Sequence, residues 1–170
     1  MHYIYCPQCG RKLIAKAAGD DGDVPFCNSC GTYWFDTFPC CTITLVANEY
    51  NEIALLRQDY MSSKHANFVS GYITPNETAE ENALREVKEE LGITAERLEY
   101  AGTYWYDKKG LLMHGFIAFA KKCDFTLSDE VDFAEWVDAK AAPEKIFPDK
   151  PGNTMFPIYK KYLEITGLSE

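Results

Sequence analysis

The segment from Gly71 to Ile93 constrains this chain most, because it combines signals that begin and end a helix with an unusual set of carboxylates. Thr78 is followed three residues later by Glu81, which is the pattern of a capping box at a helix N-terminus. Gly92 follows the last apolar position, as is typical at a helix C-terminus. The segment therefore predicts a helix from about Ala79 to Leu91.

Two faces of this predicted helix differ in character. Apolar side chains recur at helical spacing on one face, which we expect to pack on a core; they are Ala83, Leu84, Val87 and Leu91. On the neighbouring face Glu86, Glu89 and Glu90 stand at positions i, i+3 and i+4. Like charges at this spacing destabilise an isolated helix by about 0.2–0.5 kcal/mol for each pair, so the pattern favours a bound divalent cation. Mg²⁺ and Mn²⁺ suit such oxygen ligands and also bind substrate phosphates. Taken alone, however, three glutamates at this spacing more commonly form a solvated acidic face.

The complete segment follows a fixed pattern: a glycine, five residues, a Glu, seven residues, then Arg-Glu-apolar-any-Glu-Glu-any-Gly-apolar. This pattern resembles the Nudix box of pyrophosphohydrolases at every defined position. The resemblance implies that Glu86, Glu89 and Glu90 are ligands of a catalytic Mg²⁺ or Mn²⁺, and that Glu89 or Glu90 accepts the proton of the attacking water. It also implies that Arg85 orients these carboxylates and that Glu77 supports them from the preceding loop.

Four of the seven cysteines form two C-x-x-C knuckles, Cys6-Pro-Gln-Cys9 and Cys27-Asn-Ser-Cys30, separated by seventeen residues. Four thiolates satisfy a tetrahedral Zn²⁺ and leave no open position, so the pattern predicts a structural zinc ribbon. Two disulfides would need an oxidising compartment, and a thioredoxin-like motif would need a βαβ context. The other cysteines are interpreted as residues without a catalytic role; they are Cys40, Cys41 and Cys123.

The order of these signals predicts a zinc ribbon at 1–35, a connector at 36–39 and a Nudix catalytic domain at 40–170. Apolar and β-branched runs in the catalytic domain predict strands near 41–47, 52–58, 67–72, 96–106, 112–121 and 133–137. A second helix is expected from Thr154 to Ile165, where apolar residues repeat at helical spacing. A sheet with a helix on each face makes an α/β/α sandwich with a mixed sheet, which is the fold that the Nudix resemblance implies.

Composition limits the class of protein further. A chain of 170 residues with 46% hydrophobic residues has room for one catalytic core and a small appendage. Residues 1–9 carry no apolar run of signal-peptide length, and no run of about eighteen apolar residues occurs, so we expect a cytoplasmic protein without a membrane partner. The net charge of -9 opposes binding to bare polyanions and favours a small diphosphate held through a metal.

A zinc ribbon directly before a Nudix domain resembles the NADH pyrophosphatase branch of the superfamily. The resemblance implies that Tyr72, directly after the box glycine, stacks on the substrate base, and that Trp34 contributes to the same site. The alternative for Trp34 is packing between the two domains. A further metal ligand is implied ahead of Trp136, and Glu130 matches it; the alternatives are an exposed loop carboxylate at Glu130 or a ligand at the nearby Asp129 or Asp132.

The chain departs from that branch at one place that concerns the substrate. The branch carries a Ser-Gln-Pro-Trp-Pro-Phe-Pro-any-Ser signature after the box, where this chain has Thr103-Tyr-Trp-Tyr-Asp-Lys-Lys-Gly-Leu111. Within this replacement, 107–110 is interpreted as a charged hairpin tip. The resemblance implies a dinucleotide substrate, NADH or NAD⁺, cleaved to NMN(H) and AMP, with ADP-ribose, FAD, a diadenosine polyphosphate or an NAD-capped RNA end as alternatives. It also implies a homodimer.

Two functions of other classes remain open. A nucleotide-sensing module would bind its ligand through the box without cleaving it, although this box keeps all of its carboxylates. The ribbon would read nucleic acid through its basic residues Arg11, Lys12 and Lys16. Acidic residues of the same ribbon offset that charge; they are Asp20, Asp21 and Asp23.

Overall fold

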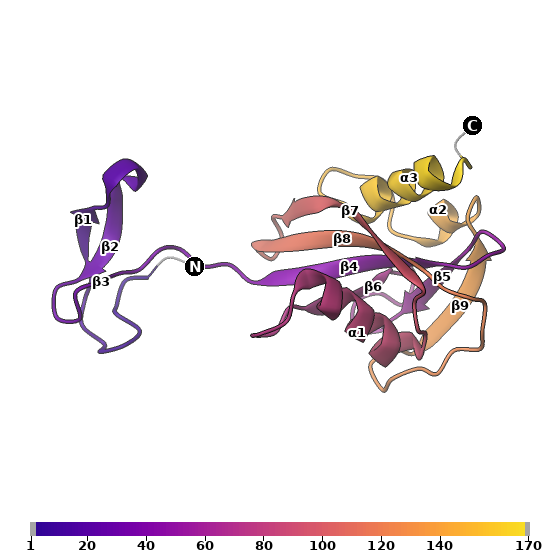
Figure 1. Cartoon of the computed structure of the whole chain (residues 1–170), viewed down its shortest axis with the longest axis horizontal. Coiled ribbons are helices and arrows are strands. Elements are labelled where there is room, and N and C mark those ends of the chain that lie inside the picture. The colour runs from indigo at the N-terminus through magenta and orange to yellow at the C-terminus, as the bar shows by residue number, and fades with distance from the viewer. Residues whose placement is uncertain (1–2, 169–170) are drawn as a thin grey trace. The chain divides into compact units, whose positions relative to one another are not determined.

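The polypeptide folds into two units, Met1–Phe38 and Pro39–Glu170. Figure 1 shows the computed structural model, which describes residues 3–168. The break between the units follows Phe38 and lies inside the connector predicted at 36–39. Among the described residues, no helix is both long enough and apolar enough to cross a membrane.

The N-terminal unit contains a small antiparallel sheet that the sequence analysis did not predict. β1 (Ile14–Ala17) pairs with β2 (Asp23–Cys27), and β2 pairs with β3 (Thr32–Tyr33), while the 3-10 turn η1 (Gly19–Asp21) joins the first two strands. Between residues 3 and 38 the buried side chains are Cys6, Val24, Phe26 and Cys27. So small a core is typical of units that a bound metal or disulfides stabilise.

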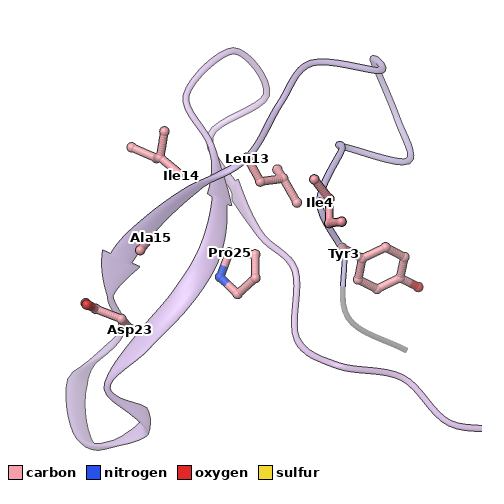
Figure 2. A pocket seen from close by; sticks show the side chains of 7 residues that line it. All are labelled: Tyr3, Ile4, Leu13, Ile14, Ala15, Asp23 and Pro25. Carbon is pink, nitrogen blue, oxygen red and sulfur yellow. The ribbon is translucent and has the colours of Figure 1, made fainter.

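One hollow of about 380 Å³ opens on this unit (Figure 2). Side chains from the N-terminal segment, β1 and β2 surround it: Tyr3, Ile4, Leu13, Ile14, Ala15, Asp23 and Pro25. The lining is mainly apolar, and Asp23 is its one charged side chain. Phosphate recognition needs cationic or convergent hydrogen-bond donor groups, so this hollow is not where a diphosphate would bind.

The second unit is built on a six-stranded mixed sheet. Its strands are β4 (Cys40–Ala47), β5 (Glu52–Arg57), β6 (Val69–Tyr72), β7 (Arg97–Tyr106), β8 (Leu111–Phe119) and β9 (Phe133–Asp138). They follow the order β7-β8-β4-β5-β9, and β6 also pairs with β4. The β4–β8 pair is parallel and the other pairs are antiparallel. Each predicted strand is present, with bounds that differ from the prediction by at most two residues.

Helix α1 (Ala79–Leu91) has the predicted bounds and the predicted ends. The backbone N–H of Glu81 donates to Thr78 Oγ1 at 3.2 Å, and the backbone N–H of Thr78 donates to Glu81 Oε2 at 2.8 Å. At the other end Gly92 takes a left-handed conformation with φ of 73°, which glycine adopts without the steric cost that a Cβ brings. Local sequence alone therefore defines this helix.

The two faces of the sheet carry separate cores. Val46 of β4 packs in one buried cluster with Val87 and Leu91 of α1. Leu45, the preceding residue of β4, packs in the other cluster with Ile158 of α3 (Met155–Thr166). The short helix α2 (Ala142–Lys145), which was not predicted, lies on the same face as α3 (Figure 1). Because neighbouring residues of one strand face opposite helical layers, the predicted α/β/α sandwich is confirmed.

One assignment on the box helix was wrong. Leu84 was placed on the buried face, but its side chain is 40% exposed. Asn82 and Glu90 are buried instead, with exposed fractions of 0% and 4%. Apolar spacing gives a helix its period but does not fix how the helix is rotated against the sheet, and here polar contacts to the sheet set that rotation.

Thr78→Ala removes the side-chain oxygen that caps α1. We expect the free energy of unfolding to fall by about 1 kcal/mol, measured by urea denaturation followed by circular dichroism. Thr94→Ala, at an exposed position beyond the helix, is the matched control and should change that free energy by less than about 0.5 kcal/mol. Equal losses in the two variants would contradict the capping role.

Candidate active site

Gly71 of β6 lies directly against the side chain of Glu86 on helix α1. A Cβ atom built on Gly71 would lie 2.0 Å from the carboxylate of Glu86, far inside van der Waals contact. Gly71 pairs with Thr42 of the central strand β4, so its backbone cannot move aside without breaking the sheet. Any side chain at residue 71 would therefore displace the carboxylate of Glu86 from its present position.

Arg85 brings three carboxylates of the box together. Its Nη1 lies 2.9 Å from Glu86 Oε1 and 2.7 Å from Glu89 Oε2. Its Nε and Nη2 donate to the two oxygens of Glu77 at 3.1 and 3.0 Å, in the paired geometry that favours Arg over Lys. The hydrogen bond from Arg85, with further donors from Thr74, holds the pKa of Glu77 far below its usual range. The contacts are those expected of a residue that orients the acidic cluster.

Asn82 is a site residue that sequence reasoning missed. It is fully buried, and its Oδ1 accepts a hydrogen bond of 2.6 Å from Thr42 Oγ1. Its Nδ2 donates to the carbonyl of Tyr72 at 2.8 Å and to Glu77 Oε1 at 3.0 Å. One amide thus ties α1 to β4, β6 and the loop that carries Glu77. A polar residue next to the apolar Ala83, near the start of a helix, was the signal that could have pointed to it.

Glu90 is the most buried acid of the box. Its Oε1 accepts a hydrogen bond of 3.2 Å from Gln58 Nε2, while its buried Oε2 has no hydrogen-bond partner among the described residues. Burial raises the pKa of Glu90 to about 8; the nearby charges of Glu86 and Glu130 add to the rise, and hydrogen bonds from Gln58 and from the backbone of Ser70 oppose it. Burial also raises the pKa of Glu86, against the effect of Arg85. A buried carboxylate oxygen without a partner is unfavourable unless a cation binds it.

These acids line one cavity of about 410 Å³. Its walls come from α1 and from the loop ahead of β9: Arg85, Glu86, Glu89, Glu90, Ser128, Asp129 and Glu130. The structure therefore brings Glu130 to the three box glutamates, and Asp129 with it. Asp132 accepts a hydrogen bond of 2.7 Å from the backbone N–H of Asp59. The acids of this lining offer oxygen donors, the type that a hard divalent cation prefers; among the described residues, only the four ribbon cysteines already have their ligand atoms within 4.8 Å of one another.

The four ribbon cysteines form a second group that could hold a metal. Their sulfurs all lie within 4.8 Å of one another, with 4.0 Å between Cys6 and Cys30 and 3.6 Å between Cys9 and Cys27. All four are free, so the disulfide alternative is not what the structure shows. Zinc–sulfur bonds of about 2.3 Å in a tetrahedron place the sulfurs about 3.8 Å apart, which matches these distances.

The two aromatic residues expected at the substrate base lie in different units. Tyr72 ends β6 beside Gly71, and its side chain is 54% exposed. Trp34 belongs to the N-terminal unit, where its ring centroid lies 5.7 Å from that of Tyr3. Tyr72 thus stands directly next to the box with its ring available for contact.

Residues 39–156 match the family model described as the NUDIX domain. The chain belongs to the Nudix family. The Nudix prediction made from the box is confirmed, and the sheet, the box helix and the acidic cavity all lie within the matched range.

Relatives of known name are similar over most of this chain. It is 28% identical over 143 residues to an NAD-capped RNA hydrolase NudC of Pseudomonas aeruginosa (strain LESB58), covering 84% of this chain and 50% of that protein. It is 28% identical over 176 residues to an NAD-capped RNA hydrolase of Schizosaccharomyces pombe, covering 87% of this chain and 46% of that one. The chain therefore spans about half the length of the curated relatives it matches.

Solved structures show the same fold. A NUDIX hydrolase from Nitrosomonas europaea superposes with a TM-score of 0.68 at 20% identity, covering 100% of this chain and 94% of that one. An Ap4A hydrolase from C. elegans superposes with a TM-score of 0.62 at 23% identity, covering 77% and 99% of the two chains. At such identities the likeness establishes the fold alone.

Glu90→Gln tests whether the ionised carboxylate of Glu90 lowers the stability of the fold. Since the pKa of Glu90 is raised from 4.5 to about 8, its contribution to stability is full below pH 4.5 and is lost as the pH rises through 8. Without added Mg²⁺ or Mn²⁺, the variant should therefore melt at a higher temperature than the wild type at pH 9 and at a similar temperature at pH 4.5, by calorimetry. Glu89→Gln, at a more exposed position, should show no such gain. A melting temperature at pH 9 below that of the wild type would refute the argument.

Proposed function

We propose that this chain hydrolyses the diphosphate bond of a nucleoside diphosphate joined to a second group, with NADH or NAD⁺ cleaved to NMN(H) and AMP. The observation that carries the proposal is the cavity in which Glu86, Glu89, Glu90 and Glu130 converge beside Arg85. The names of the Pseudomonas and Schizosaccharomyces relatives, both NAD-capped RNA hydrolases, support an NAD-type substrate or an NAD-capped RNA end.

The four glutamates of this cavity would hold Mg²⁺ or Mn²⁺. Such an ion neutralises phosphate charge and lowers the pKa of a water molecule. The chain's own residues position these ligands. Arg85 holds the carboxylates of Glu86 and Glu89, and Glu77 in turn holds the guanidinium of Arg85. The proton of the attacking water passes to Glu89 or Glu90, whichever of the two is not bound directly to the ion, because a carboxylate bound to the ion is a poor base.

The substrate base would stack on Tyr72, which is exposed at the end of β6. The part in base binding that the family resemblance implies for Trp34 stays a prediction. The segment that replaces the family signature offers another aromatic contact. Its Tyr104 donates a hydrogen bond of 2.6 Å to the carbonyl of Ala101 and packs against the core, whereas Trp105 is 47% exposed. Trp105 is therefore the member of this segment best placed to distinguish ADP-ribose, FAD or diadenosine polyphosphates from NADH.

The test is hydrolysis of NADH, NAD⁺, ADP-ribose, FAD, diadenosine polyphosphates, nucleoside triphosphates and NAD-capped RNA, with Mg²⁺ and then Mn²⁺, and with products identified by mass. Preferential release of NMNH and AMP from NADH would establish the proposed reaction. Preference for another compound would change the assigned substrate, while the assigned reaction, hydrolysis of a diphosphate bond, would still hold. Binding without turnover on all of them would overturn the proposal in favour of a nucleotide sensor.

Glu89→Gln should lower kcat by orders of magnitude, because it removes an acid from the cavity without changing the volume of the side chain. The fold should persist, since Glu89 is exposed and Arg85 keeps Glu77 and Glu86 as partners. Glu99→Gln, an exposed acid on β7 paired with Arg97, is the matched control and should retain wild-type kcat. Near wild-type turnover in Glu89→Gln would sink the role assigned to this residue.

We further propose that Zn²⁺ occupies the ribbon, held by Cys6, Cys9, Cys27 and Cys30, and that the chain forms the homodimer and has the cytoplasmic location that the family resemblance implies. Atomic emission should find one zinc for each wild-type chain. Cys9→Ser should lose most of it, whereas Cys123→Ser, an exposed cysteine outside the cluster, should retain it. Equal zinc content in the two variants would exclude the four-cysteine site.

A further inference from the structure

Gln58 is a buried polar residue that neither the box nor the comparisons account for. It follows the last residue of β5 and is 3% exposed. Its side-chain amide donates to Oε1 of Glu90, a contact between residues 32 positions apart that are both more than nine-tenths buried. A buried amide that donates to a buried acid of the cavity must affect how that acid is presented.

The backbone at Gln58 is held independently of its side chain. The carbonyl of Gln58 accepts hydrogen bonds from the backbone N–H groups of Met61 and Ser62 at 2.8 and 3.1 Å. On either side, Asp132 forms two hydrogen bonds: its backbone N–H donates to the carbonyl of Arg57 at 3.0 Å, and its Oδ2 accepts from the backbone N–H of Asp59 at 2.7 Å. The amide is therefore delivered to Glu90 from a fixed turn, on the same side of the molecule as the loop that carries Glu130.

The amide differs in an informative way from Arg85, the other group that holds acids of this cavity. Arg85 is a cation, and it offsets the charge of Glu86 and Glu89 while it positions them. Gln58 is neutral, so it fixes Glu90 Oε1 without offsetting the charge of that carboxylate. The remaining oxygen, Oε2, is buried and has no hydrogen bond of normal geometry among the described residues, although the backbone N–H of Ser70 lies near enough to this carboxylate to favour its ionised form. Both of these donors are neutral, so the carboxylate keeps its charge and can bind a cation through Oε2.

We propose that Gln58 is a positioning residue: it holds Glu90 through Oε1 so that Oε2 is presented to the divalent cation of the acidic cavity. This inference rests on the proposed function, because it assumes that Glu90 is a ligand of that cation. It adds a residue outside the box, directly after β5, that governs the affinity of the site for metal without touching the substrate.

The test is the dissociation constant of Mn²⁺ alone, measured from the signal of free Mn²⁺ in electron paramagnetic resonance, on the full chain. Gln58→Met removes the donor at similar length, and Gln58→Asn keeps an amide but shortens its reach by one methylene group. Both variants should bind Mn²⁺ about tenfold or more weakly than the wild type, which is the usual effect of removing a group that orients a metal ligand. Their kcat on the preferred substrate should recover as Mn²⁺ is raised, with KM unchanged.

Asn48 provides a matched control. It is 5% exposed, and its amide donates to Glu52 Oε2 at 2.7 Å, but it does not line the acidic cavity. Asn48→Leu should lower the melting temperature and leave the Mn²⁺ dissociation constant unchanged. If Gln58 had only a structural role, the Gln58 variants would give this same result.

Three outcomes would overturn the role of Gln58: Mn²⁺ binding within twofold of the wild type in both Gln58 variants, loss of activity that added Mn²⁺ does not restore, or failure of both variants to fold. The proposed function fails separately. A wild-type chain that binds Mn²⁺ but hydrolyses none of the tested nucleotides would refute the reaction, while the comparison of Mn²⁺ affinities would still decide the role of Gln58.

Discussion

The guanidinium of Arg85 is the interaction on which the arrangement of the box depends. Three carboxylates, on Glu77, Glu86 and Glu89, lie within 3.1 Å of its nitrogens. Without it, the loop before α1 and one face of the helix would present like charges to each other. With it, Glu86 can lie against the backbone of Gly71, in the only space that the absence of a side chain provides. The position of Glu86 against Gly71 depends on this cation, while Asn82 and the apolar cluster of Val87 and Leu91 hold the helix to the sheet.

Arg85 contacts Glu77, Glu86 and Glu89 but forms no ion pair with Glu90 or Glu130. These two acids explain why the site is suited to a metal. One cation offsets less charge than four nearby glutamates and Glu77 carry when ionised, and Glu90 is not in contact with it; the pKa of Glu90 is raised to about 8, mainly by burial. A buried acid of this kind costs stability, since a well-packed apolar residue is often more stable at such a position, and a bound cation would offset that cost. The cost to stability of burying Glu90 is thus consistent with its proposed role as a metal ligand.

The sequence predicted those features that short-range chemistry determines. The ends of α1 came from Thr78, Glu81 and Gly92, which act within one turn of the helix, and the six strands of the second unit came from their apolar runs. The burial of Asn82 and Glu90 and the exposure of Leu84 could not be read in this way, because they depend on the rotation of α1 against β4 and β6. The role of Gln58 could not be predicted for a similar reason. It depends on a contact with Glu90, 32 positions away, and no local sequence pattern indicates that contact.

The departure from the NADH pyrophosphatase signature acquires a physical meaning in the structure. Proline-rich segments do not pair along their length in a sheet, because proline has no N–H to donate. Here residues 103–106 pair with β8 as part of a regular hairpin, whose tip closes with a hydrogen bond of 3.0 Å from Gly110 to Tyr106. Pairing forces the aromatics to alternate, so that Tyr104 packs on the core while Trp105 faces away from it. A paired strand therefore occupies the place where the signature has its prolines, and any recognition of the base at this edge must rely on a side chain fixed by sheet register.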